Sequence, residues 1–232
     1  MKIITAYQDF KEFRNTIKSI SFVPTMGNLH KGHMALIDKA KSYDDHVSAS
    51  IFINPLQFND ASDFNNYPKS LDDDIALLSK HGCDSLFIPD SSILEDIKKI
   101  KAPDTALYLC GMNRPGHFDG VLTIINKLFE ITKPTRTFFG KKDFQQLTLI
   151  KNFVKESNLS VEIISVDTVR ESNGLAMSSR NNRLSESDRE KASKLYEILS
   201  LIKDSSNNLS NEIIKKHKDD LIRQGFDVDY LS

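Results

Sequence analysis

The sequence predicts an α/β fold in which helices flank a parallel sheet, followed by a small helical C-terminal domain. Short apolar stretches alternate with amphipathic stretches at helical spacing, which is typical of strand–helix–strand crossover units. One of these strands runs directly into a glycine-containing turn and a helix. After Arg183 the pattern becomes helical throughout. We therefore expect one domain over residues 1–173 and a second over 174–232.

In the first part of the chain, we expect a helix over residues 9–20, a strand over 21–24, a helix over 32–43 and a buried strand over 46–53. Ser70 opens the next helix, with Asp73 three residues later as a variant capping box. Leu71, Ile75 and Leu78 follow at helical spacing. A strand over 85–88 completes this part.

A long polar connection over residues 89–118 comes next, in which residues 93–101 are a helix candidate. The pattern then predicts a helix over 120–132, a strand over 135–139, a helix over 143–157 and a strand over 161–166. From Ser185 the chain reads as helical to Gln224, with a break rich in Ser and Asn at residues 205–208. The alternation up to residue 166 describes a Rossmann-like sheet.

The composition is that of an ordinary globular protein. The 232 residues are 39% hydrophobic and 27% charged, and the formal net charge is −1, so the balance does not indicate a nucleic-acid-binding protein. No stretch has the length of a membrane span, and the N-terminus becomes polar too soon for a signal peptide. Cys83 and Cys110 lack metal-ligand spacing and form no disulfide framework, which fits a reducing cytoplasm.

The most informative segment is residues 22–33, where a short strand meets a glycine turn and two histidines. We expect free backbone N–H groups and the helix dipole to face a nucleotide phosphate here. His30 and His33 fall on about one helical turn and can place donors on the same polyphosphate. The structural alternative is that one histidine caps the helix and the other packs.

Residues 24–33 read Pro-Thr-Met-Gly-Asn-Leu-His-Lys-Gly-His, and four further segments occur in order at 50–58, 114–120, 139–146 and 174–181. Together they resemble the pantothenate synthetase (pantoate–β-alanine ligase) family of the nucleotidylyltransferase superfamily. The resemblance extends from about residue 1 to about residue 205. It implies an ATP-dependent ligase that forms a carbon–nitrogen bond.

The resemblance also implies roles for particular residues. The catalytic group comprises His30, His33, Lys142 and Arg180. The expected ATP contacts are Met26, Gly27, His30, Gly32, His33, Gly140, Lys141, Lys142, Asp143, Val169, Met177, Ser178, Ser179 and Arg180. Pantoate and β-alanine are expected at Asn54, Gln57, Tyr67 and Gln146. Asp73 and Asp74 are candidate Mg²⁺ ligands, although acids in a first helical turn more often just complement the dipole.

Residue chemistry agrees with several of these roles. Gln57 follows a buried strand, at the sheet edge where α/β proteins bind ligands, and its amide can both donate and accept. Lys142 can supply charge to phosphate oxygens. Ser178, Ser179 and Arg180 form a polar loop whose hydroxyls and guanidinium can hydrogen-bond a triphosphate.

The implied reaction has two steps. The carboxylate of pantoate attacks the α-phosphorus of ATP, giving pantoyl adenylate and pyrophosphate. The amine of β-alanine then attacks the acyl carbon and releases AMP, forming pantothenate in the route to coenzyme A. The expected partners are ATP with Mg²⁺, pantoate and β-alanine, with no nucleic acid and no membrane, and the family implies a cytoplasmic homodimer.

The chain departs from the family pattern in three places. Cys110 stands where the family usually has Glu before the Arg-Pro-Gly-His segment, and Lys141 stands where it often has Glu. The chain also stops at Ser232, several tens of residues before most members, so we expect a C-terminal domain that is shortened or a fragment. Two alternatives stay open: a degenerate protein that binds ATP or pantoate without turnover, and an adenylyltransferase for another acid.

Overall fold

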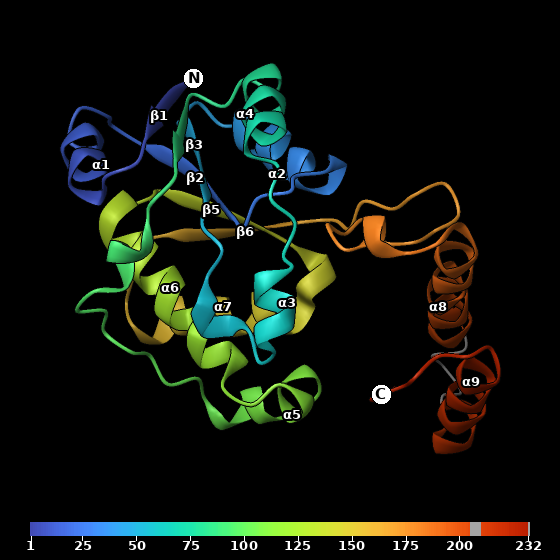
Figure 1. The fold of residues 1–232 in the computed structure, drawn as a ribbon. Coiled ribbons are helices and arrows are strands. Elements are labelled where there is room, and N and C mark those ends of the chain that lie inside the picture. Colours follow the sequence, from blue (N-terminus) through green and yellow to red (C-terminus); the bar gives the residue numbers. More distant parts are fainter. Residues whose placement is uncertain (205–209, 232) are drawn as a thin grey trace. The chain divides into compact units, whose positions relative to one another are not determined.

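The computed structural model describes residues 1–204 and 210–231 (Figure 1). The chain forms two compact units, Met1–Asp167 and Thr168–Ser232, so the division lies slightly before the expected boundary after residue 173. No helix in the described ranges is long and apolar enough to cross a membrane.

The first unit is built on a six-stranded sheet with the order β1-β4-β3-β2-β5-β6, in which every neighbouring pair is parallel. The strands are β1 (Lys2–Ile4), β2 (Ile20–Thr25), β3 (His46–Ile51), β4 (Ser85–Phe87), β5 (Arg136–Gly140) and β6 (Glu162–Val166). The predicted Rossmann-like parallel sheet is therefore confirmed.

Helices cover both faces of this sheet (Figure 1). Side chains of α1 (Tyr7–Arg14), α6 (His117–Thr132) and α7 (Phe144–Glu156) pack in one core cluster, which also contains Phe22 of β2. Those of α2 (Lys31–Lys41) and α4 (Leu71–Lys80) pack in a second cluster, which contains Val23. The helices α3 (Ala61–Asn65) and α5 (Cys110–Asn113) are short. Phe22 and Val23 are both fully buried, because consecutive strand residues face opposite cores.

The strand order places a switch point between β2 and β5. From β2 the chain builds β3 and β4 on one side, and it then returns to form β5 and β6 on the other side of β2. Open α/β sheets bind ligands in the crevice that such a reversal leaves beyond the carboxyl ends of the strands. The segments that follow β2, β3 and β5 therefore meet at one edge.

Near the N-terminus the structure differs from the sequence prediction in one helix end and in one additional strand. The first helix ends at Arg14 rather than Ile20, because Ile20 is fully buried in β2 and pairs with His46 of β3. The edge strand β1 was not predicted at all. Only Ile4 of its three residues is buried, and its partner β4 lies some eighty residues along the chain, so no local pattern marks it.

The helix expected over residues 93–101 does not form, and only a 3₁₀ turn at Ser91–Leu94 is present. The backbone N–H of Ile100 donates to Thr123 Oγ1 at 2.9 Å, and that of Ala102 donates to Asp119 Oδ1 at 2.8 Å. Both acceptors belong to α6. The end of this connection thus gives two of its backbone N–H groups to side chains of a neighbouring helix instead of to a helix of its own.

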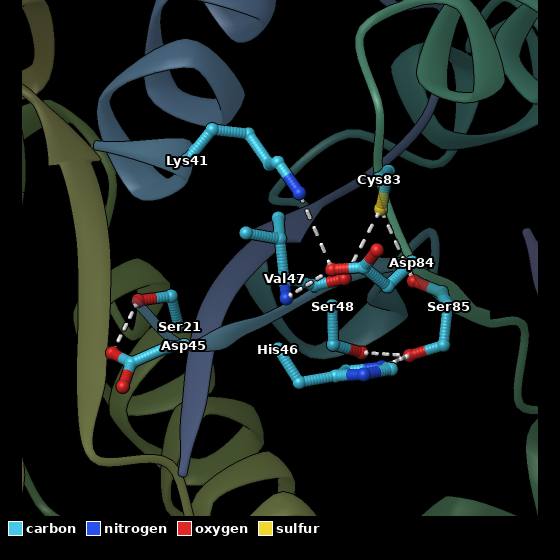
Figure 2. A network of polar contacts seen from close by, with 9 residues as sticks. All are labelled: Ser21, Lys41, Asp45, His46, Val47, Ser48, Cys83, Asp84 and Ser85. Atoms are coloured by element: carbon cyan, nitrogen blue, oxygen red, sulfur yellow. Dashed lines mark hydrogen bonds and ion pairs between the residues drawn. The ribbon is translucent and has the colours of Figure 1, made fainter. Parts of the chain in front are cut away.

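A polar network joins the amino ends of β2, β3 and β4, at the edge opposite the switch-point crevice (Figure 2). The carboxylate of Asp84 accepts from the backbone N–H of Val47 at 2.8 Å and lies 3.6 Å from Lys41 Nζ. Ser85 Oγ donates to Ser48 Oγ at 3.0 Å and lies 2.9 Å from a ring nitrogen of His46. These bonds satisfy polar groups buried in the sheet and fix the start of the strands.

The second unit contains α8 (Glu186–Asp204) and α9 (Asn211–Arg223), so the predicted helical character after residue 185 is confirmed. The predicted break at 205–208 lies outside the described residues. Before α8, the segment from Val169 to Met177 folds back on itself. Arg170 and Ala176 form an antiparallel bridge, and the guanidinium of Arg170 lies 3.6 Å from the centre of the Tyr196 ring.

Candidate active site

The turn after β2 is held by side chains of the protein itself. Gly27 has φ +81° and Asn28 has φ +49°, so two consecutive residues take the left-handed conformation. A Cβ on Gly27 would lie 3.1 Å from Asp74 Oδ2, which adds a steric reason for glycine there. The backbone N–H of Gly27 donates to Thr25 Oγ1 at 3.2 Å. The N–H groups of Asn28 and Leu29 donate to Asp74, at 2.8 and 2.7 Å.

This geometry corrects one sequence prediction. The N–H groups of Gly27, Asn28, Leu29, His30 and Gly32 all donate to protein acceptors, and so they are not free for a phosphate. The side chains of His30 and His33 are therefore the main donors that this segment can offer to an anion.

His30 and His33 each use one ring nitrogen to build the start of α2. His30 is the N-cap, and its Nδ1 accepts from the N–H of Gly32 at 3.1 Å. The Nδ1 of His33 accepts from the N–H of His30 at 3.2 Å. A neutral imidazole that accepts at Nδ1 carries its proton on Nε2. Both histidines therefore do take part in capping the helix, as the structural alternative proposed for one of them. The same bonds fix both rings as Nε2–H donors.

Both histidines are held in the neutral form. Burial lowers the pKa of His30 from 6.5 to about 4, and the positive charge of Lys142 contributes to this lowering. For His33, burial is again the main cause of a pKa near 3, and His30 and Lys142 add to the effect. The two ring centres are 4.1 Å apart. Within the described chain neither Nε2 has a hydrogen-bond partner, so two neutral donors stand side by side.

Lys142 reaches this pair from the end of β5. Gly140 ends the strand, and the 3₁₀ turn Lys141–Asp143 leads into α7. Lys141 pairs with Asp167 at 2.6 Å, which directs its charge to the neighbouring strand end instead of the histidines. Lys142 is exposed, and its positive charge contributes to the lowered pKa of His30 and His33. Asp143 is also exposed.

Asn54 and Gln57 follow β3, and Asn54 is almost completely buried, with 1% of its surface exposed. Its amide donates to Gln57 Oε1 at 3.0 Å and to the backbone oxygen of Gly120 at 3.1 Å. Asn54 therefore orients the Gln57 side chain, while the Gln57 amide nitrogen points away from that bond. The backbone oxygen of Gln57 lies 2.7 Å from His117 Nδ1.

The two glutamines at the start of α7 have different surroundings. Gln145 donates to the backbone oxygen of Tyr108 at 2.7 Å and accepts from the N–H of Cys110 at 3.1 Å. It thus holds the segment that contains Cys110 in place. Gln146 is partly buried, and its amide makes no hydrogen bond within the part of the chain that the structure describes. Gln146 is therefore the glutamine that a substrate can engage.

The other substrate candidate, Tyr67, is 6% exposed, and its ring packs edge-on against Phe58 with centres 5.8 Å apart. Met26 is partly buried in the turn after β2.

The remaining predicted ATP contacts lie in the second unit, where Asn181 holds their loop in place. The N–H of Met177 donates to the oxygen of Val169 at 3.0 Å. Asn181 donates from its amide to Glu171 Oε1 at 2.8 Å, and its N–H donates to the backbone oxygen of Ser178. The N–H of Arg180 donates to Ser178 Oγ at 3.3 Å, and Ser179 is 8% exposed. Figure 1 shows this segment between β6 and α8 along the chain.

The two metal candidates differ from each other. Asp73 is exposed at the first turn of α4. Asp74 is 2% exposed, and both of its carboxylate oxygens accept hydrogen bonds from the turn after β2. The predicted capping box is wrong, because Ser70 makes no side-chain cap and its Oγ donates to Asp74 instead, at 3.2 Å. The described residues contain no cluster of three or more His, Cys, Asp or Glu that could hold a metal.

The structure thus brings together His30, His33 and Lys142 at the switch point, with Asn54, Gln57 and Gln146 on adjoining segments of the same sheet edge. Sequence reasoning missed the roles of Asp74 and Gln145. Asp74 sits in a run of three aspartates, and Gln145 precedes another glutamine. No local signal separates either residue from its neighbours.

Comparison with known proteins identifies related sequences of one kind. A pantothenate synthetase from Acinetobacter baylyi is 43% identical over 94% of this chain and 80% of its own length. One from Marinomonas sp. is 46% identical over 92% of this chain and 79% of its own.

Solved structures give the same result. A pantothenate synthetase from Thermus thermophilus superposes with a TM-score of 0.91 at 37% identity, covering 100% of this chain and 86% of its own. A pantoate-beta-alanine ligase from Francisella tularensis, solved with beta-gamma ATP and beta-alanine, has a TM-score of 0.84 and 41% identity over 94% of this chain and 85% of its own. The family model described as pantoate-beta-alanine ligase matches residues 2–232, and the chain belongs to this family.

Proposed function

We propose that this chain condenses pantoate with β-alanine at the expense of ATP, releasing AMP and pyrophosphate. The observation that carries the proposal is the pair of neutral Nε2–H donors on His30 and His33, beside Lys142 and at the switch point of the sheet. The family membership and the Francisella tularensis complex with beta-gamma ATP and beta-alanine support it.

In the first step, a carboxylate oxygen of pantoate attacks the α-phosphorus of ATP, and the bond from that phosphorus to the β-phosphate oxygen breaks. A carboxylate is already a nucleophile at neutral pH, so no base is needed. Negative charge grows on the phosphate oxygens and on the leaving pyrophosphate. His30 and His33 donate Nε2–H hydrogen bonds to this charge, and Lys142 supplies a positive charge, without moving a proton.

Neutral histidines suit this role better than charged ones. An imidazolium would have to lose the bond that its Nδ1 accepts, because a protonated Nδ1 would face a backbone N–H in both rings. Donors that are already oriented need no reorganisation as the charge develops. The site is therefore built to stabilise charge and not to act as an acid.

In the second step, the unprotonated amine of β-alanine attacks the acyl carbon of the adenylate. The bond to the phosphate oxygen breaks, AMP leaves, and the nitrogen loses a proton to form the amide. We assign pantoate to the amides of Gln57 and Gln146, with Asn54 orienting Gln57 and with Tyr67 at the wall of the site. These residues offer donors and acceptors for hydroxyl groups and a carboxylate.

We assign the phosphate chain of ATP to the turn after β2 and to Gly140 through Asp143 after β5, where the side chains of His30, His33 and Lys142 supply the donors and Met26, Gly27 and Gly32 set the path of the backbone. For the second unit by itself, family membership implies ATP contacts at Val169 and over residues 177–180. The hydroxyls of Ser178 and Ser179 and the guanidinium of Arg180 have the donors that phosphate oxygens accept. Mg²⁺, if bound with the nucleotide, would neutralise charge on the phosphate oxygens. Both oxygens of Asp74 are engaged by protein donors, so this carboxylate does not fit the role of a metal ligand.

Family membership supports a homodimer that acts in the cytoplasm, where ATP is available. Light scattering at micromolar concentration tests the assembly, and a monomer mass would reject the dimer.

Product analysis tests the reaction directly. The purified chain is incubated with ATP, Mg²⁺, pantoate and β-alanine, and the products are identified by mass. Pantothenate and AMP in equal amounts support the proposal. A folded chain that binds ATP but forms no pantothenate would favour a binding protein without turnover, and AMP formation with another acid would favour a different substrate.

A further inference from the structure

We infer that Asp74 is a positioning residue of the nucleotide site and not a metal ligand. Asp74 holds the turn after β2 so that His30 and His33 keep their Nε2–H groups on the ligand side. The inference rests on the proposed function only for the identity of the ligand. Its structural part concerns bonds within this chain.

Asp74 directs both of its carboxylate oxygens at the turn. Its Oδ2 accepts from the N–H of Asn28 at 2.8 Å, and its Oδ1 accepts from the N–H of Leu29 at 2.7 Å and from Ser70 Oγ at 3.2 Å. Bonds of this length to an ionised carboxylate are stronger than bonds between neutral groups. With 2% of its surface exposed, Asp74 is directed to the turn and not to solvent.

The turn needs such an acceptor. A non-glycine residue at φ +49° costs free energy, and the partly buried N–H groups of Asn28 and Leu29 need acceptors. A carboxylate can accept from both N–H groups through its two oxygens and carries no donor of its own. Asp74 thus stabilises a backbone conformation that local preferences oppose.

The conformation of this turn determines how the rings of His30 and His33 are oriented. The chain passes from Leu29 straight into His30, which leaves the turn in an extended conformation and caps α2 through Nδ1. The N–H of His30 orients His33. A change in the path of residues 28 and 29 therefore rotates both rings and changes which nitrogen carries the proton.

The test uses Asp74→Asn, which keeps the shape of the side chain but turns one acceptor into an NH₂ group facing a backbone N–H. Asp72→Asn is the matched control, because Asp72 is exposed on the same helical turn and the change in charge is the same. The first readout is the protonation pattern of the histidine rings by ¹⁵N NMR in the absence of nucleotide and metal. This readout does not depend on activity.

We expect the wild type and Asp72→Asn to show the assigned His30 and His33 rings fixed in the Nε2–H form, and Asp74→Asn to lose at least one of these two signals. We also expect Asp74→Asn to lower kcat/KM for ATP on the order of 10²-fold, the loss that a small misplacement of a catalytic group produces. Raising the Mg²⁺ concentration should not restore it.

Unchanged ring signals in a folded Asp74→Asn chain would overturn the inference, and so would recovery of its activity at high Mg²⁺. An Asp73→Asn variant makes the Mg²⁺ measurement more decisive, because two residues that share one metal ion would show the same dependence on Mg²⁺.

If Asp74→Asn does not fold, Ser70→Ala removes one donor to the same carboxylate, and the ring signals of His30 and His33 should broaden or shift. Unchanged signals in Ser70→Ala would count against the inference. Failure of the wild type to make pantothenate would reject the proposed function but leave the ring measurement valid.

Discussion

His30 and His33 show how one residue can serve structure and chemistry together. Each ring gives Nδ1 to the backbone at the start of α2 and keeps Nε2–H for a ligand. The two hydrogen bonds decide the position of the proton, and burial beside Lys142 decides that there is only one proton on each ring. Both properties follow from the protein before any substrate arrives.

At this scale, replacing His33 by Ala should lower the rate of adenylate formation on the order of 10²–10³-fold, the loss typical of one preoriented donor. The rate is measured as release of pyrophosphate in a single turnover. Circular dichroism provides the control, because α2 must still form for the comparison to hold. A loss of less than about threefold would reject the role of His33 in this step.

The lowered histidine pKa values also predict how stability depends on pH. In the unfolded chain a histidine takes up its proton near pH 6.5, whereas folded His30 resists protonation until about 4 and folded His33 until about 3. The unfolded state therefore binds more protons below pH 6.5, and the free energy of unfolding falls as the pH falls through this window.

Urea unfolding of the wild type and of His33→Gln at about pH 7.5 and about pH 5.5 measures this effect. The wild type should lose more stability between the two values than the variant does. An equal loss in both proteins would mean that folded His33 titrates like an exposed histidine.

At the scale of elements, α6 positions the segment after β3 by a close backbone approach. A Cβ on Gly120 would lie 2.1 Å from the backbone oxygen of Leu56 and 2.8 Å from the N–H nitrogen of Gln57. The amide of Asn54 also donates to the oxygen of Gly120. The helix thus packs directly on the turn that carries Gln57, and glycine is required for this contact.

Gly120→Ala should therefore destabilise the chain by about 1–3 kcal/mol, the usual cost of overpacking, and raise KM for pantoate by displacing Gln57. Gly140→Ala is the stability control, since a Cβ there would meet its nearest neighbour only at 4.0 Å. Thermal unfolding and initial rates measure the two effects. Equal stability of the two variants would show that α6 can shift at no cost.

Elements also show the limits of sequence reasoning. The strands β2, β3, β5 and β6 and the helices α2, α6 and α7 were predictable, because each has local apolar periodicity. The edge strand β1 depends on pairing with β4 far along the chain, and the N–H groups of Ile100 and Ala102 donate to side chains of α6. At the site, the motif residues could be named in advance. The bonds that Asp74 and Gln145 make could not, because they join distant segments.

At the scale of the whole molecule, segments from three parts of the sequence form one site because parallel strands end at the same edge. The turn after β2, the segment after β3 and the turn after β5 all follow carboxyl ends around the switch point (Figure 1). With a formal net charge of −1, the chain as a whole does not attract a polyphosphate, so we expect the attraction to be local, with Lys142 as the candidate charge.

Formation of the adenylate at this site is best measured as isotope exchange between ATP and pyrophosphate, in the presence of pantoate and in the absence of β-alanine. Exchange that requires pantoate is the predicted result, because the adenylate must form reversibly before any amine is present. Exchange that is absent from a folded chain able to bind ATP, or that proceeds equally well without pantoate, would contradict the adenylate mechanism.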